Sequence, residues 1–193
     1  MELIAFGENV LPAGVVGGRV QRFESVEDVL AFLDNESQGV VALTPFAGST
    51  FLSPILENLA AIVTITGTRT GHLAIVSREF QIPCVLQTQI TGEIDGHEVL
   101  LDARDVSIAR IYRCPTSLLV VLRGRELAGR KDLESVMEPS SAATLDDALS
   151  LLEAAGYVEA RSGEPTRYAL ADKGRDALER CFAGDRRAAG STD

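Results

Sequence analysis

Residues 67–79 of the chain are Gly67-Thr68-Arg69-Thr70-Gly71-His72-Leu73-Ala74-Ile75-Val76-Ser77-Arg78-Glu79. They follow a buried apolar strand signal at residues 61–65, and their glycines predict a tight turn before a helix from about residue 71 to residue 78. We expect His72 on the first turn of that helix, while Leu73, Ile75 and Val76 enter the core. Free N–H groups at a helix start stabilise an anion, and a neutral imidazole there is a usable nucleophile at pH 7.

Four residues around His72 are candidates for supporting an anion on its ring. Thr70 can hydrogen-bond the imidazole or a phosphoryl group, and Arg69 or Arg78 can offset the negative charge. Gly71 lies in the same turn and is counted with these phosphate-supporting residues. The alternative is a histidine that only caps the helix or packs in a core, because one residue at one helix start is a weak signal.

The segment resembles the phosphohistidine signature of the phosphoenolpyruvate (PEP)-utilising enzymes. This family includes pyruvate phosphate dikinase, phosphoenolpyruvate synthase, rifampicin phosphotransferase and the first enzyme of the sugar phosphotransferase system. Its usual pattern is G-G-x-T-S-H-A-A-I-V-A-R-E, then G-I-P-A-V and a D-G-x-x-V-x-V-D segment. The matching residues are Gly67, Thr70, His72, Ala74, Ile75, Val76, Arg78 and Glu79, with further blocks at residues 12–20, 82–85 and 95–102. The resemblance covers about residues 8–112.

The resemblance implies a swiveling β/β/α domain. In the family, the histidine takes a phosphoryl or pyrophosphoryl group at a nucleotide-binding domain and delivers it at a second active site, which makes His72 the expected carrier. The turn and the first two residues of the helix depart from the pattern at three positions. Thr68 replaces a glycine, Gly71 replaces a serine and removes its hydroxyl, and Leu73 replaces a small residue and is expected to narrow the space beside His72. A degenerate domain is therefore the alternative.

The pattern around this segment predicts an α/β fold with both sheet faces covered. Residues 40–45, 61–65, 84–86, 99–102 and 108–112 give apolar strand signals, and residues 14–20 give a glycine-rich turn into a strand. Residues 26–33 suit a helix with a capping box from Ser25 to Asp28, and Ser53-Pro54 marks another helix start. We place this domain at residues 1–113.

Residues 114–184 predict a small winged-helix α+β domain, followed by a polar tail at 185–193. Helical segments at about 117–127, 131–137 and 142–155 precede a hairpin over 157–170 and a helix over 172–182. Residues 151–159 and 168–178 are similar to segments of winged-helix transcription regulators. The third helix carries Asp146, Asp147 and Glu153 with no Lys or Arg between Ser140 and Glu159, so we expect docking to protein, including a second copy, rather than to DNA.

The composition of the 193 residues narrows the function further. The net charge is −10, no membrane span or signal peptide is visible, and we expect a cytoplasmic protein. Cys84, Cys114 and Cys181 form no C-x-x-C pair, so neither a metal site nor a disulfide framework is expected. His97 is expected in an exposed turn.

These observations predict the phosphocarrier component of a split PEP-utilising, dikinase-type phosphotransferase, catalytically incomplete by itself. We expect no cofactor on this chain. ATP or PEP with Mg²⁺ would be used by partner proteins, one of them nucleotide-binding and ATP-grasp-like and another acceptor-binding, and a homodimer is left open. The competing hypothesis is a regulator that joins a degenerate swiveling domain to a DNA- or protein-binding winged helix.

Overall fold

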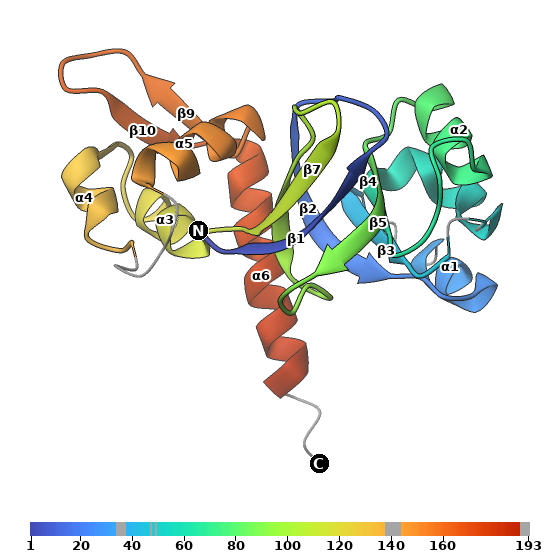
Figure 1. Cartoon of the computed structure of the whole chain (residues 1–193). Coiled ribbons are helices and arrows are strands. Elements are labelled where there is room, and N and C mark those ends of the chain that lie inside the picture. The colour runs from blue at the N-terminus through green and yellow to red at the C-terminus, as the bar shows by residue number, and fades with distance from the viewer. Residues whose placement is uncertain (34–37, 47, 49, 138–143, 190–193) are drawn as a thin grey trace. The chain divides into compact units, whose positions relative to one another are not determined.

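The computed structural model describes residues 1–33, 38–46, 48, 50–137 and 144–189, with side chains as far as residue 182. The chain divides into two compact units, Leu3–Tyr112 and Met1–Glu2 with Arg113–Asp193 (Figure 1). Met1 and Glu2 belong with the second unit because the Glu2 carbonyl oxygen accepts a 2.9 Å hydrogen bond from the Arg113 N–H. The Glu2 carboxylate also pairs with the Arg113 guanidinium at 2.9 Å.

The first unit is built on a closed barrel of seven strands in the order β1-β5-β4-β3-β2-β6-β7. The strands are β1 (Leu3–Asn9), β2 (Val15–Arg22), β3 (Val40–Thr44), β4 (Leu59–Thr64), β5 (Cys84–Ile90), β6 (Glu98–Asp102) and β7 (Ile108–Arg113). Neighbouring strands in the series β2, β3, β4 and β5 pair in parallel. β1 pairs antiparallel with β5 and with β7, and β2 pairs antiparallel with β6. The predicted α/β class is confirmed, but the sheet closes on itself instead of forming an open sandwich.

Three helical segments lie outside the barrel: α1 (Val26–Leu33), the 3-10 helix η1 (Thr50–Asn58) and α2 (His72–Glu79) (Figure 1). The capping box predicted for α1 is present, because the Asp28 carboxylate accepts from the Ser25 N–H at 2.9 Å and the Ser25 hydroxyl accepts from the Asp28 N–H at 3.3 Å. The helix start predicted at Ser53-Pro54 is wrong. η1 begins at Thr50 and contains Pro54 inside it.

Alternation along the parallel strands builds two hydrophobic cores. In β3, Val40 and Ala42 pack with residues of the helical segments, whereas Val41 and Leu43 pack with residues from the strands around the barrel. The expectation that both sheet faces are covered is therefore confirmed for these strands. Each fully buried Val or Leu side chain contributes about 1.5–3 kcal/mol relative to exposure, so this alternation fixes the register of the barrel.

β1 was not anticipated from the sequence. It contains Gly7, and a Cβ there would lie 2.5 Å from the Leu86 carbonyl oxygen of β5. Its first residues, Leu3-Ile4-Ala5-Phe6, form a short apolar run, but the polar residues Glu8 and Asn9 follow and carry no strand signal. The closure of the barrel pairs this segment with both β5 and β7 and extends the strand to Asn9.

The second unit consists of helices and a small antiparallel sheet in the order β8-β10-β9. Its elements are α3 (Thr116–Arg123), β8 (Ala128–Gly129), α4 (Arg130–Glu134), α5 (Leu145–Ala154), β9 (Val158–Arg161), β10 (Arg167–Leu170) and α6 (Asp172–Ala189). The short strand β8 is an addition to the predicted elements. α6 extends beyond the predicted residue 182 and into the segment assigned to a polar tail. The start expected for the third helix, at residue 142, lies outside the described residues.

None of the helices in the described part of the chain combines the length and the apolar character needed to cross a membrane.

Candidate functional site

His72 is the first residue of α2, and its side chain is exposed, as predicted. The N-cap residue Gly71 is extended, with φ −69° and ψ 159°, and has no side chain with which to cap the helix. The first N–H groups of a helix have no intrahelical acceptor, so this end of α2 presents unpaired donors and a partial positive charge. Among the described residues, none forms a hydrogen bond with the His72 side chain. The imidazole is therefore free to react with a group brought from outside.

The residues after His72 fix α2 to the barrel. Leu73 and Ala74 are buried in the core beneath the helices, and the buried Ser77 hydroxyl donates a 3.0 Å hydrogen bond to the Ala74 carbonyl oxygen. The prediction that Leu73 narrows the space beside His72 is wrong, because its side chain turns into this core. The prediction that Ile75 is buried is also wrong. Its side chain is 45% exposed, since it lies two residues from Leu73 and hence on the opposite face of the helix.

The turn before α2 is held by hydrogen bonds to its backbone. Gly67 adopts a φ of 119°, which glycine alone tolerates readily. Its carbonyl oxygen accepts a 3.1 Å hydrogen bond from the Gln87 side-chain amide of β5. The Gly71 N–H donates to the Thr68 carbonyl oxygen at 2.9 Å, which closes the turn directly before His72. The position of the histidine is therefore set by a braced turn as well as by the helix.

Thr70 is exposed in this turn, and its hydroxyl oxygen lies 3.4 Å from that of Thr68. The two hydroxyls are within hydrogen-bonding distance of each other and both reach solvent. A role of Thr70 and Gly71 in binding phosphate stays a prediction.

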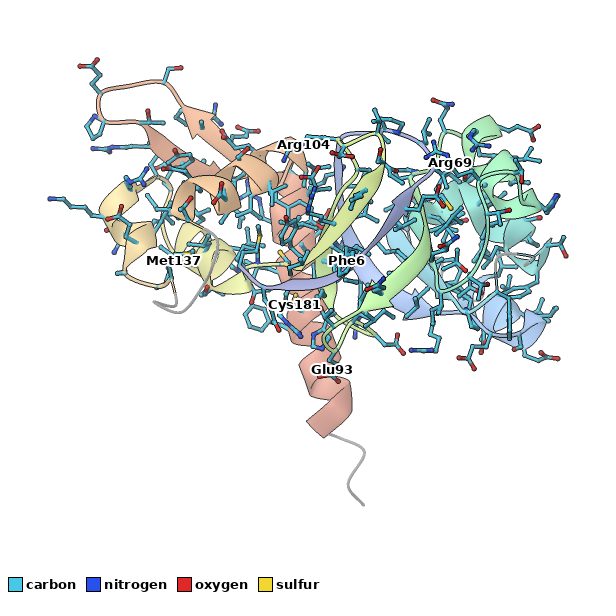
Figure 2. All side chains as sticks on the ribbon, viewed as in Figure 1. Phe6, Arg69, Glu93, Arg104, Met137 and Cys181 are labelled. Carbon is cyan, nitrogen blue, oxygen red and sulfur yellow. The ribbon has the colours of Figure 1, made fainter. Side chains whose placement is uncertain are left out.

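The two predicted arginines are both engaged with the turn. The Arg69 guanidinium, labelled in Figure 2, donates a 2.9 Å hydrogen bond to the Asn9 carbonyl oxygen at the end of β1. Its Nη1 atom also lies 3.8 Å from the Glu8 carboxylate. Arg78, on the last turn of α2, donates to the Arg69 carbonyl oxygen at 2.8 Å. Both guanidinium groups thus stand at the turn that precedes His72. Their use in offsetting a phosphoryl charge remains a prediction.

Supporting residues that the sequence did not reveal are Gln87, Glu8 and Asn9. Each contacts the turn only because β5 pairs with β4, and β1 with β5, in the closed barrel. Gln87 has a φ of 50°, unusual for a residue other than glycine. No local sequence signal identifies such long-range partners.

The remaining candidates lie elsewhere. His97 is in a turn, as predicted, but is half-buried, with its Nε2 3.5 Å from the Glu93 carboxylate. Cys84 is fully buried, as predicted, and burial raises the pKa of its thiol to about 12. A thiol with that pKa is not a nucleophile near neutral pH. In the described ranges, no three His, Cys, Asp or Glu side chains are grouped closely enough to hold a metal ion.

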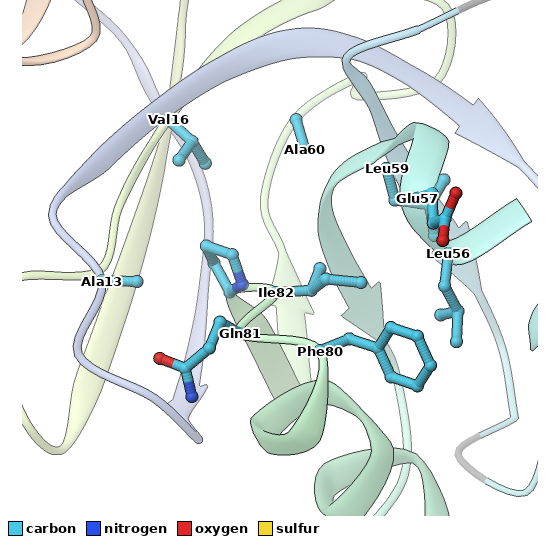
Figure 3. Close-up of a pocket in the computed structure, with 10 residues that line it drawn as sticks. Ala13, Val16, Leu56, Glu57, Leu59, Ala60, Phe80, Gln81 and Ile82 are labelled. Carbon is cyan, nitrogen blue, oxygen red and sulfur yellow. The ribbon is translucent and has the colours of Figure 1, made fainter.

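A pocket of about 370 Å³ lies where α2 ends, beside η1 (Figure 3). It is lined by Ala13, Val16, Leu56, Glu57, Leu59, Ala60, Phe80, Gln81, Ile82 and Pro83. The only charged side chain in this lining is the carboxylate of Glu57, so the pocket is ill-suited to phosphate. His72 starts the helix that ends here, and its imidazole therefore stands on the exposed surface at the other end.

Comparison with known proteins defines the class of this domain. Residues 37–105, which include the turn and all of α2, match the family model of the mobile domain of PEP-utilising enzymes. Residues 37–105 are therefore similar to the mobile domain of PEP-utilising enzymes, as the sequence motifs indicated.

Two particular proteins are similar to parts of the chain. Phosphoenolpyruvate synthase of Pyrococcus furiosus is 36% identical over 88 residues, which are 46% of this chain and 10% of that enzyme. The chain thus matches about a tenth of the length of this curated relative. An NMR structure of an Enzyme I protein shares 20% identity over 57% of this chain and 41% of its own, with a TM-score of 0.36.

Proposed function

We propose that the first unit is a phosphohistidine carrier and that His72 is the residue that carries the phosphoryl or pyrophosphoryl group. The observation that carries the proposal is the exposed imidazole at the start of α2, inside the segment that matches the family model. A carrier must present the same atom to a donor site and to an acceptor site. An exposed residue on a rigidly anchored helix end meets that requirement, whereas a residue inside a pocket does not.

The chemical step follows from this geometry. The unprotonated ring nitrogen of His72 attacks the phosphorus of the donor, and the bond from that phosphorus to the leaving oxygen breaks, with the electron pair going to that oxygen. The other ring nitrogen keeps its proton. The carried group adds negative charge beside the unpaired N–H groups of α2, where the helix dipole is favourable. Delivery to the acceptor reverses these bond changes.

The donor and acceptor sites belong, in this proposal, to partner proteins. Donor candidates are ATP and PEP, with Mg²⁺ held in the partner's site, and the partner is a nucleotide-binding, ATP-grasp-like protein. The similarity to phosphoenolpyruvate synthase supports PEP as one of the molecules at the partner sites. The second partner binds the acceptor. The mostly apolar pocket near α2, with its single carboxylate, gives no reason to place phosphate donor binding on this chain.

For the second unit we propose a winged-helix-like module that docks to protein. Three helices, the β9–β10 hairpin and a final helix follow one another in the order expected of that fold. The helix that would read DNA, α5, carries Asp146 and Asp147 in its first turn. Arg130 is already paired with Asp146, and with Glu134 at 2.8 Å. A surface of this charge repels the DNA backbone. Docking would instead raise the local concentration of His72 at a partner's site.

Phosphoramidate tests the carrier proposal without any partner protein. Attack by the His72 ring nitrogen on its phosphorus breaks the P–N bond and releases ammonia. We expect one acid-labile, alkali-stable phosphoryl group on the wild-type protein, located at His72 by mass spectrometry. It should be lost in His72→Ala and kept in His97→Ala. A phosphoryl group that persists in His72→Ala, or that is found only on His97, would refute the assignment.

A further inference from the structure

We propose that the hydroxyl of Thr68 binds the phosphoryl group carried on His72. This hydroxyl lies beside the N-cap residue of α2, Gly71, which has no side chain of its own. This inference rests on the proposed carrier function and adds a binding residue to it. Thr68 stands where the family pattern has a glycine.

The first observation is the unfilled position at the helix start. Helices usually begin with Ser, Thr, Asp or Asn, whose side-chain oxygen binds the free N–H groups of the first turn. Here the N-cap residue is Gly71, and no side chain of the described residues caps α2. The end of the helix beside His72 therefore lacks the oxygen atom that such a residue would supply.

The second observation is the position of the Thr68 hydroxyl. A Cβ atom built on Gly71 would lie 3.5 Å from the Thr68 Oγ1 atom and 3.1 Å from the Thr68 carbonyl oxygen. The Thr68 hydroxyl thus stands beside the position from which a side chain at residue 71 would extend, at van der Waals distance. It is held there because the Thr68 carbonyl oxygen accepts a 2.9 Å hydrogen bond from the Gly71 N–H.

The hydroxyl is also available to a ligand. Thr68 is exposed, and the contact of its side chain is with the Thr70 hydroxyl at 3.4 Å, which is long for a hydrogen bond between two hydroxyls. A phosphoryl oxygen is a stronger acceptor than a neutral hydroxyl. With a phosphoryl group on His72, the Thr68 O–H donates to one of its oxygens, and no covalent bond to Thr68 is formed or broken.

The proposal explains two departures from the family pattern, Thr68 and Gly71, as a single coupled change. A hydroxyl is missing at position 71 and a hydroxyl is gained at position 68, and the two positions meet in space. The close approach of position 71 to the Thr68 carbonyl oxygen also explains why glycine suits this turn. A side chain added at position 71 would lie 3.1 Å from that oxygen, which would have to shift by a few tenths of an ångström to accept it.

The test measures the rate of phosphorylation of His72 by phosphoramidate, and the half-life of the product, in purified variants of the full chain. We expect Thr68→Val to reduce the rate or the half-life about tenfold, the equivalent of one charge-assisted hydrogen bond, while Thr68→Ser keeps both. Thr91→Val is the matched control, since Thr91 lies at the far end of β1 with its hydroxyl 3.4 Å from the Leu3 carbonyl oxygen. Thermal unfolding monitors the fold of each variant.

A double variant that moves the hydroxyl from position 68 to position 71 tests whether its location matters. Thr68→Gly should behave like Thr68→Val, and adding Gly71→Ser to it should restore the wild-type rate and half-life. Equal values for Thr68→Val and wild type, or a double variant no better than Thr68→Gly, would overturn the role of Thr68. A wild-type protein that takes no phosphoryl group on His72 would overturn the carrier function itself, so the two failures are distinct.

Discussion

The guanidinium of Arg78 donates a 2.8 Å hydrogen bond to the carbonyl oxygen of Arg69, which ties the last turn of α2 to the turn before its first residue. Because Arg69 in turn donates to the Asn9 carbonyl oxygen, the helix, the turn and strand β1 form one chain of contacts around His72. These contacts fix the geometry of the turn from which the imidazole projects.

Removing this tie should affect the site more than the fold. We expect Arg78→Ala to lower the free energy of unfolding by only about 1 kcal/mol, since it loses one hydrogen bond at the surface. Loading of His72 by phosphoramidate should fall about threefold to tenfold, because the turn is loosened and one positive charge is lost. Arg22→Ala, which removes a surface arginine paired with Glu24 and Asp95, is the control. Unchanged loading of Arg78→Ala would show that the tie is dispensable.

Truncation of two adjacent residues of α2 should change the free energy of unfolding by very different amounts. His72→Ala removes an exposed side chain and should change the free energy of unfolding by no more than about 0.5 kcal/mol. Leu73→Ala leaves a cavity in the core under the helix and should cost roughly 2–5 kcal/mol. Denaturant unfolding measures both. A large loss of stability in His72→Ala would show that the histidine is structural.

The buried thiols should be inert in the native protein. Cys84 and Cys114 are buried, and Cys181 on α6 is partly exposed (Figure 2). Treatment with iodoacetamide at about pH 8 should therefore modify Cys181 alone under native conditions and all three in denaturant. Peptide mass spectrometry identifies the sites, and rapid native alkylation of Cys84 would contradict the packing of β5.

The Cys84 thiol should make the free energy of unfolding depend on pH in the alkaline range. The pKa of Cys84 is raised from 9.0 to about 12 in the folded state, so the folded protein holds this proton at a pH where the unfolded chain has lost it. Its contribution is fully present below pH 9 and declines as the pH rises from 9 toward 12. Cys84→Ala should reduce this decline in unfolding measurements across that range.

Acid should weaken the start of α5. The hydrogen bonds from the Thr144 hydroxyl at 2.8 Å and the Thr144 N–H at 2.9 Å lower the pKa of the Asp147 carboxyl below its ordinary value of 3.8. A lowered carboxyl pKa gives stability that is present above the unfolded value and is lost as the pH falls through the folded one. Asp147→Asn should therefore lower the Tm at neutral pH and flatten its dependence on pH below about 4. An identical pH profile for both proteins would contradict this capping interaction.

The sequence was most informative where signals are local. The helix over residues 71–78, the turn glycines and the position of His72 follow from spacing and from a motif, and the structure places α2 at His72–Glu79. The closure of the barrel and the second half of β1 could not be read in this way, because Gly7, Glu8 and Asn9 carry no local strand signal and belong to the strand through pairing with β5 and β7. For the same reason, Gln87 and Asn9 gave no sign that they brace the turn.

The sequence also did not predict which apolar side chains of α2 are buried. Ile75 and Leu73 are both apolar and both belong to the motif, yet one is exposed and the other buried. An eight-residue helix is too short for apolar spacing alone to fix which side faces the barrel. The place of the Thr68 hydroxyl beside position 71 likewise depends on the fold of the turn and has no counterpart in the linear pattern.

The central claim is tested most directly by enzymatic phosphoryl transfer. The full chain is incubated with a purified ATP-grasp-type partner, Mg²⁺ and radiolabelled PEP or ATP, with the ATP label at the β or the γ position in separate reactions. We predict acid-labile, alkali-stable label on the wild-type chain and on His97→Ala, and none on His72→Ala. Label on His72→Ala, or no label on the wild-type chain while the partner turns over its donor and phosphorylates another carrier, would contradict a phosphoryl-carrying His72.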